Sequence, residues 1–150
     1  SSLLEELALP WIRLIVRKDE RGLSSAVLRG LQDVDTQYCV VMDADGSHPP
    51  DAIPATIKAL EEGADFVIGS RYVSGGRVIN WNSIRKMISR LGCLYSRIIL
   101  NIPTKDLTGG YNCWSREVLR NINLANLISN GFSFQIEMNF LTWIKDKDHN

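Results

Sequence analysis

Short apolar runs alternate with stretches of helical spacing along the first half of the chain. Residues 11–16 (WIRLIV) are a compact β-rich run, whereas residues 22–34 carry apolar side chains three and four positions apart. The first pattern predicts a strand and the second predicts a helix. Residues 38–42 (YCVVM) form a continuous apolar run that ends abruptly in acidic residues. Such a run is typical of a buried parallel strand at its carboxyl end.

A second helix and a third strand follow these acidic residues. The helix is predicted to begin near residues 49–51, because proline is tolerated in a first helical turn and Asp51 complements the helix dipole. Gly63 is expected to end the helix, and residues 65–69 (DFVIG) predict another buried strand. The side chains expected to face the core are Ile53, Ile57 and Leu60.

The second half of the chain is predicted to be mainly helical. Residues 73–80 are glycine-rich and predict a mobile loop, and residues 83–100 have the spacing of a long amphipathic helix. A short strand at 111–114, a short helix at 116–122 and a longer helix at 132–144 complete the pattern.

Strands that alternate with helices indicate an α/β fold, with right-handed crossovers and a mostly parallel, doubly wound sheet flanked by helices. In such sheets ligands bind beyond the carboxyl ends of the strands. Asp43, Asp45, Ser70 and Arg71 all fall there. We therefore expect the functional site at this edge.

Composition limits the alternatives without naming a function. The chain has 150 residues, 45% of them hydrophobic, which suits a single globular domain. Its 17 basic and 17 acidic residues give a formal net charge of zero, which argues against a nucleic-acid partner and makes any basic site local. Cys39, Cys93 and Cys113 lie among apolar residues and are expected to be reduced core thiols in a reducing compartment.

Neither a membrane span nor a signal peptide is predicted. The most hydrophobic stretch, residues 87–102, contains Arg90 and Arg97, so no window reaches the roughly 18 to 20 uninterrupted apolar residues that a span requires. The first residues have no basic start and no small-residue cleavage site.

The strongest chemical signal is VVMDADGSHPPD, residues 40–51. Asp43 and Asp45 at the end of a buried strand can both reach one hard divalent ion, and Mg2+ or Mn2+ bridges carboxylates to phosphates. A bare D-x-D more often only caps a turn. A calcium loop is excluded because glycine follows the second aspartate directly and two prolines come next. A haloacid dehalogenase-like phosphatase, with Asp43 as nucleophile, remains a remote alternative that lacks a convincing later lysine and acidic pair.

A second signal is GSRYVSGGRVINW, residues 69–81, followed by Arg85 and Ser89. Arg71 falls at the same sheet edge as the aspartates, and Arg85 falls early in the next helix. Guanidinium groups in these positions suit phosphate oxygens, which they bind bidentately, although each alone is equally compatible with a solvated surface arginine.

These motifs together resemble the glycosyltransferase family 2 enzymes of GT-A fold, and among them the dolichyl-phosphate and polyprenyl-phosphate mannose synthases. The resemblance covers about residues 13 to 140. It rests on six blocks in order: RGLSSAVLRG, MDADGSHPPD, GADFVIGSRYVSGGRVINW, R-x-x-x-S at 85–89, DLTGGYNCWSREVL and GFSFQIEM.

The resemblance implies a role for each matching residue. Asp43 and Asp45 match the metal-binding aspartates, with Asp45 also counted as catalytic, and Ser47 stands where these synthases usually have glutamine. We expect Ser47 to reach the metal through a water molecule. Arg71, Arg85 and Ser89 match positions that handle the donor diphosphate and the acceptor phosphate, and the resemblance implies that the two arginines are catalytic. Asp106 and Thr108 match the substrate-binding segment on the acceptor side. Asp106 is equally compatible with an ordinary turn residue.

The sequence also departs from the family pattern. Nothing before Trp11 resembles the family's first strand with its D-D-x-S motif, which grips base and ribose, and no basic membrane-facing segment follows the FQIEM helix. Residues 1–150 are therefore expected to be a partial catalytic domain, incomplete at both ends.

The implied reaction is inverting, metal-dependent transfer of a hexose to a polyprenyl or dolichyl monophosphate, with mannose from GDP-mannose favoured. Transfer of glucose from UDP-glucose and a non-catalytic, truncated fragment are the alternatives. The resemblance further implies peripheral association with the cytoplasmic face of the plasma membrane or endoplasmic reticulum, and an anchoring domain or subunit outside this chain.

Overall fold

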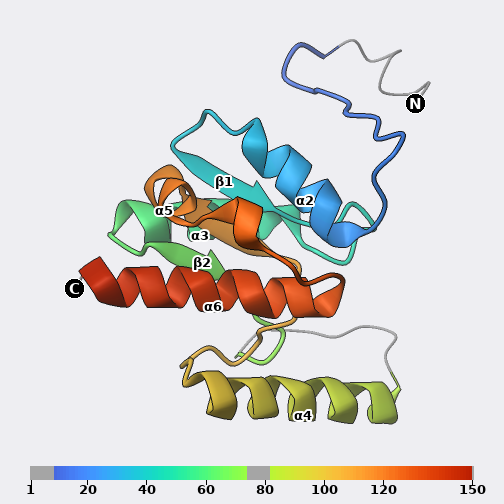
Figure 1. Cartoon of the computed structure of the whole chain (residues 1–150), viewed down its shortest axis with the longest axis vertical. Coiled ribbons are helices and arrows are strands. Elements are labelled where there is room, and N and C mark those ends of the chain that lie inside the picture. The colour runs from blue at the N-terminus through green and yellow to red at the C-terminus, as the bar shows by residue number, and fades with distance from the viewer. Residues whose placement is uncertain (1–8, 74–81, 150) are drawn as a thin grey trace.

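The computed structural model describes residues 9–73 and 82–149 (Figure 1). Helices and strands alternate through its first half as the apolar pattern predicts. The elements there are α2 (Leu23–Gln32), β1 (Tyr38–Val41), the 3-10 turn η1 (Pro50–Ala52), α3 (Ile53–Glu61) and β2 (Phe66–Ile68). The later elements are α4 (Ser83–Leu100), β3 (Asn112–Ser115), α5 (Arg116–Asn121), η2 (Leu124–Asn126) and α6 (Phe132–His149).

The α/β class is confirmed, but the expected parallel pairing of neighbouring strands is wrong for the described sheet. Its order is β1-β3-β2, and both β1 and β2 pair with β3 in antiparallel fashion. β1 and β2 therefore run in the same direction with β3 inserted between them. Apolar runs predict strands but carry no information on which strand becomes the neighbour, which explains the error.

The inserted strand determines which loops meet. Val41 and Ile68, at the carboxyl ends of β1 and β2, both lie opposite Asn112, at the start of β3. The loops that follow β1 and β2 and the loop that precedes β3 consequently leave the sheet at one edge. This is the edge at which ligands were expected.

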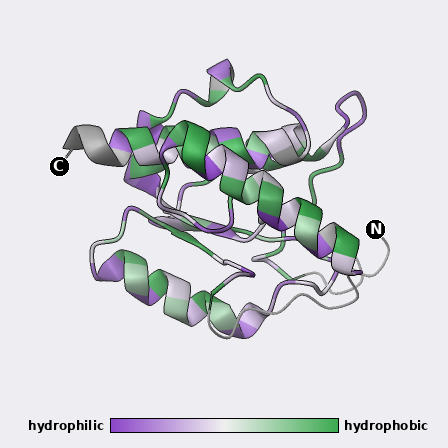
Figure 2. Ribbon diagram, turned by 90° about the horizontal axis from the view of Figure 1, so that it is seen from below, coloured by the Kyte–Doolittle hydropathy of each residue, from purple (hydrophilic) through white to green (hydrophobic). Residues whose placement is uncertain are grey.

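The sheet lies between two layers of helices (Figure 2). Side chains of β3 alternate between α3 on one face of the sheet and α6 on the other. Asn112 donates to Gln135 of α6 and Trp114 donates to Thr142 of the same helix, whereas Cys113 hydrogen-bonds Thr56 of α3. The main apolar core lies on the α6 side of the sheet. It comprises Leu31, Cys39, Trp114, Val118, Leu119, Ile122, Phe134 and Met138.

The strand predicted at residues 11–16 is wrong, because these residues have no regular secondary structure. Trp11 and Val16 are 76% and 70% exposed, and the described sheet holds no strand beside them. A strand needs a partner for its backbone groups, so local β propensity alone does not create one. Of the glycine-rich stretch predicted as a mobile loop, residues 74–80 lie outside the described residues.

The cysteines are placed as the sequence predicts, and the lengths of the described helices bear on the predicted lack of a membrane span. All three cysteines are buried and free, as expected of core thiols. Burial raises the pKa of the Cys39 thiol to about 11, which keeps it protonated and unreactive at neutral pH. Within the described ranges, no helix is both long and apolar enough to cross a bilayer.

Gly69, which follows β2, allows a close approach that carries a testable consequence. Its N–H donates to the Tyr111 carbonyl over 2.8 Å, and a Cβ at this position would overlap the buried Tyr111 ring. Gly69→Ala is expected to lower the free energy of unfolding by about 1–3 kcal/mol, as overpacking does. Urea denaturation measures the change. Gly92→Ala in α4, where a Cβ meets nothing within 4 Å, is the control and is expected to be neutral or slightly stabilising.

Candidate functional site

Asp43 and Asp45 lie on the loop that joins β1 to η1, so the expected position of the carboxylate pair is confirmed. Gly46 has a φ of 77°, which turns the chain back and lets the Ser47 N–H donate to Asp45 Oδ1 over 2.9 Å. Hydrogen bonds from the Ser47 side chain and backbone hold the pKa of Asp45 below its ordinary value. Asp45 is exposed and remains anionic at neutral pH.

His48 contacts Asp43 from within the same loop. The Asp43 N–H donates to His48 Nδ1 over 2.9 Å, and Nε2 lies 3.8 Å from Asp43 Oδ2. The imidazole packs against Tyr111, with 5.6 Å between ring centroids, and only 17% of the His48 side chain is exposed. The Asp43 carboxylate itself is 47% exposed and accessible to a ligand.

The loop before β3 approaches the carboxylate pair at Gly110. A Cβ added there would lie 3.0 Å from Asp43 Oδ2 and 3.4 Å from His48 Cε1. The absence of a side chain at this position leaves room for both groups. The aspartate motif and the D-L-T-G-G segment, separate in sequence, therefore border one site.

Arg71, which follows β2, is held by the same loop through an ion pair with Asp106. Its Nε and Nη2 donate to the two carboxylate oxygens over 2.7 and 2.6 Å, and its backbone N–H also donates to Oδ2. Arg71 Nη2 further donates to Thr108 Oγ1 over 2.8 Å. Asp106 is fully buried, whereas 22% of the Arg71 side chain is exposed. Arg71 thus presents a rigidly held guanidinium at the site edge.

The protonation state of this pair follows from its geometry. Burial by itself raises the pKa of Asp106, but hydrogen bonds from Arg71 and its positive charge outweigh burial and hold that pKa below its ordinary value. The hydrogen bonds to Asp106 raise the pKa of Arg71 in turn. Both groups are therefore charged at neutral pH.

Tyr72 connects Arg71 to α4. Its hydroxyl donates to Ser89 Oγ over 2.7 Å, and its ring lies 5.6 Å from the Arg71 guanidinium carbon and 5.5 Å from that of Arg90. These residues border an open pocket of about 410 Å³ that gathers four cationic side chains. Its lining consists of Arg71, Tyr72, Val73, Arg90, Leu94, Arg97 and Lys105.

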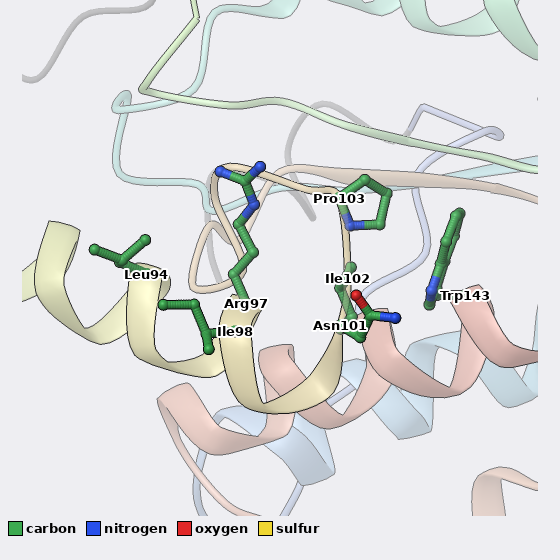
Figure 3. Close-up of a pocket in the computed structure, with 7 residues that line it drawn as sticks. All are labelled: Leu94, Arg97, Ile98, Asn101, Ile102, Pro103 and Trp143. Atoms are coloured by element: carbon green, nitrogen blue, oxygen red, sulfur yellow. The ribbon is translucent and has the colours of Figure 1, made fainter.

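A second pocket, of about 650 Å³, adjoins the basic one and shares Leu94 and Arg97 with it. Figure 3 shows Leu94, Arg97 and Ile98 projecting from α4 and Trp143 from α6. Apart from Arg97 and Asn101, its lining residues are apolar. A cationic region and an apolar one are thus contiguous beside α4.

The structure brings most of the predicted site residues to one edge of the sheet. Arg71, Asp106 and Thr108 form one cluster, and Ser89 joins it through Tyr72. Arg85 lies in the first turn of α4, and its side chain is outside the described part of the structure. Sequence reasoning did not single out His48, Tyr72, Tyr111 or Gly110, although His48 lies within the quoted aspartate block.

The carboxylate pair has the donor chemistry of a magnesium or manganese site. No cluster of three or more His, Cys, Asp or Glu side chains that could hold a metal occurs among the described residues. Two carboxylates still fit Mg2+, which usually keeps several waters and takes its other ligands from substrate phosphates.

Comparison with known proteins gives consistent results. A family model described as "Glycosyl transferase family 2" matches residues 2–122. The chain is 41% identical to an undecaprenyl-phosphate mannosyltransferase of Micrococcus luteus over 89% of its length, and 40% identical to a polyprenol monophosphomannose synthase of Mycolicibacterium smegmatis over 95%. It is 42% identical to a dolichol-phosphate mannosyltransferase of Pyrococcus furiosus over 87%. The matches cover 56%, 55% and 36% of those relatives.

Proposed function

Because the chain belongs to glycosyl transferase family 2, we propose that its protein transfers mannose from GDP-mannose to a polyprenyl or dolichyl monophosphate. The observation that carries the proposal is that two exposed aspartates and a fixed arginine lie at one sheet edge. The names of the three relatives support the choice of sugar and acceptor. All three name a mannosyltransferase or a phosphomannose synthase, and two of them name a lipid phosphate.

The carboxylate pair is proposed to hold Mg2+ or Mn2+. Asp43 and Asp45 would be the protein ligands, with Ser47 contributing through a water molecule. The ion, when bound, neutralises the charge that develops on the departing diphosphate. The exposure of both carboxylates supports this role, since waters and a diphosphate can complete the coordination.

Positioning, rather than proton transfer, is proposed to drive the attack on the sugar. An acceptor phosphate is already anionic near neutral pH, so no protein base is required. Arg71 would bind a substrate phosphate, and Asp106 and Thr108 would act through Arg71 by fixing its guanidinium plane. This assigns Asp106 a positioning role in place of the direct substrate contact that the resemblance implies, because Asp106 is fully buried.

The acceptor is proposed to reach the site from a membrane surface, with the protein peripheral on the cytoplasmic face. Two features support this placement. The basic pocket adjoins a largely apolar one. Apolar residues recur along α4 (Figure 2), and many of its large apolar side chains are exposed. Those that are more than half exposed are Ile84, Met87, Ile88, Leu91, Tyr95, Ile98 and Ile99.

Calorimetric titration of the full-length protein with GDP in the presence of Mn2+ tests the proposal. Binding that requires Mn2+, followed by mannose transfer from GDP-mannose to a short polyprenyl phosphate, is the expected result. Transfer from UDP-glucose instead would establish glucose as the sugar. Failure to bind both GDP and UDP in the presence of Mn2+ would show a non-catalytic protein.

Arg85 is expected to act on a substrate phosphate rather than as a surface charge. Arg85→Ala should lower kcat/KM by about 100-fold, the loss of a charge-assisted bidentate contact, with little change in melting temperature. Arg85→Lys should recover only part of the rate, since a point charge cannot reproduce a planar fork. Arg120→Ala, at an exposed position of α5, is the control. Wild-type rates in Arg85→Lys would refute the geometric part of this prediction.

A further inference from the structure

We infer that His48 is a positioning residue that fixes Asp43 for metal binding without itself binding the metal. This inference rests on the proposed function, because it concerns the metal that Asp43 would hold.

The hydrogen bond between the Asp43 N–H and His48 Nδ1 determines where the imidazole proton lies. Nδ1 accepts this bond over 2.9 Å, so Nδ1 carries no proton. A neutral imidazole then has its single proton on Nε2. When Nε2 carries the proton, it has no lone pair to offer a cation. His48 therefore cannot bind a metal as long as its Nδ1 accepts the hydrogen bond from the Asp43 N–H.

The same arrangement orients both ends of Asp43. The backbone N–H is fixed by Nδ1, and Nε2 lies 3.8 Å from Asp43 Oδ2. At this separation the Nε2–H attracts the carboxylate, either directly or through one bridging water. The Asp43 carboxylate is thereby biased toward one orientation while 47% of its side chain stays exposed to a ligand.

The imidazole is itself largely enclosed. The Tyr111 ring packs against it with 5.6 Å between centroids and a tilt of 56°, the Gly110 backbone lies beside Cε1, and only 17% of the His48 side chain is exposed. Pro49 follows directly and restricts the His48 backbone to extended conformations. Because the His48 ring is already ordered by its surroundings, it can orient Asp43 with little further loss of side-chain entropy.

The test measures Mn2+ binding to the full-length protein in the presence of GDP, by calorimetry and by electron paramagnetic resonance. His48→Ala is expected to weaken Mn2+ binding by about tenfold or more, as loss of groups that orient a ligand does. His48→Asn places an amide oxygen near the position of Nδ1 and is expected to stay within about threefold of wild type. His48→Gln places its amide near Nε2 and is expected to resemble His48→Ala.

Each alternative has its own outcome. Equal Mn2+ affinity in wild type and His48→Ala would overturn the inference alone. Nitrogen hyperfine coupling from a directly bound imidazole in the wild type would show that His48 is a ligand. Rescue by Gln but not Asn would show that the bond from the Asp43 N–H to Nδ1 is not what fixes Asp43, and would overturn the inference. Thermal unfolding in EDTA checks folding, and the Asn and Gln variants decide the case if His48→Ala does not fold. Failure of the wild type to bind Mn2+ with GDP would overturn the proposed function together with this inference.

Discussion

Asp43→Asn and Asp45→Asn are each expected to lower metal-dependent transfer by more than about 100-fold while leaving the fold intact. The proposed metal site offers few protein ligands, so removing one carboxylate would remove a large share of the coordination of the proposed ion. Both aspartates are exposed and lie outside the core, which is why stability should change little. Initial rates at several Mn2+ concentrations, together with melting temperatures in EDTA, measure the two effects separately.

Two neighbouring substitutions sharpen this prediction. Ser47→Ala should be milder, because Ser47 is expected to reach the metal only through water, and a loss as severe as that of the aspartates would show a direct ligand. Asp51→Asn removes a charge from the exposed 3-10 turn η1 and should leave transfer unchanged. Retention of most activity by either Asp43→Asn or Asp45→Asn would disprove the metal assignment.

Arg71→Ala is expected to cause the largest loss of stability among these variants, about 3–5 kcal/mol at neutral pH. The substitution leaves the Asp106 carboxylate buried without its partner, and breaking a buried ion pair from one side costs about this much. Adding Asp106→Asn to Arg71→Ala should recover part of the loss, since no charge is then left buried. Urea denaturation of the single and double variants measures both steps.

The stability loss in Arg71→Ala should depend on pH. In the wild type the pKa of Asp106 is lowered, so its contribution to stability is present above the unfolded pKa of about 3.9 and is lost as pH falls through the folded pKa. In Arg71→Ala the guanidinium charge and its side-chain hydrogen bonds are lost. Burial, which raises that pKa, is then opposed only by the backbone hydrogen bonds from residues 71 and 108, so the pKa rises and Asp106 can escape its penalty by taking up a proton. The difference in unfolding free energy between wild type and variant should therefore shrink from pH 7 to pH 4. A constant difference would mean that Asp106 does not carry the effect.

Local patterns were sufficient where an element's own side chains determine it. The bounds of α4 match the predicted residues 83–100 because an amphipathic spacing over 18 residues allows one regular structure. The apolar run at residues 38–42 likewise became β1. The apolar run at residues 11–16 did not form the predicted strand, because a strand requires a neighbouring strand that no local pattern supplies.

The sequence by itself determined the chemistry available to this protein: two aspartates one residue apart after an apolar strand, arginines after the next strand, and the motifs of a glycosyltransferase. Only the tertiary structure decided which groups act together. Arg71 and Asp106 are 35 residues apart in the chain, and Asp43 meets Gly110 from a still more distant segment. These contacts exist because β3 inserts antiparallel between β1 and β2 and brings the loop before it to their carboxyl ends. Such pairing is determined by how the whole sheet packs between its helices, a property that no local preference encodes.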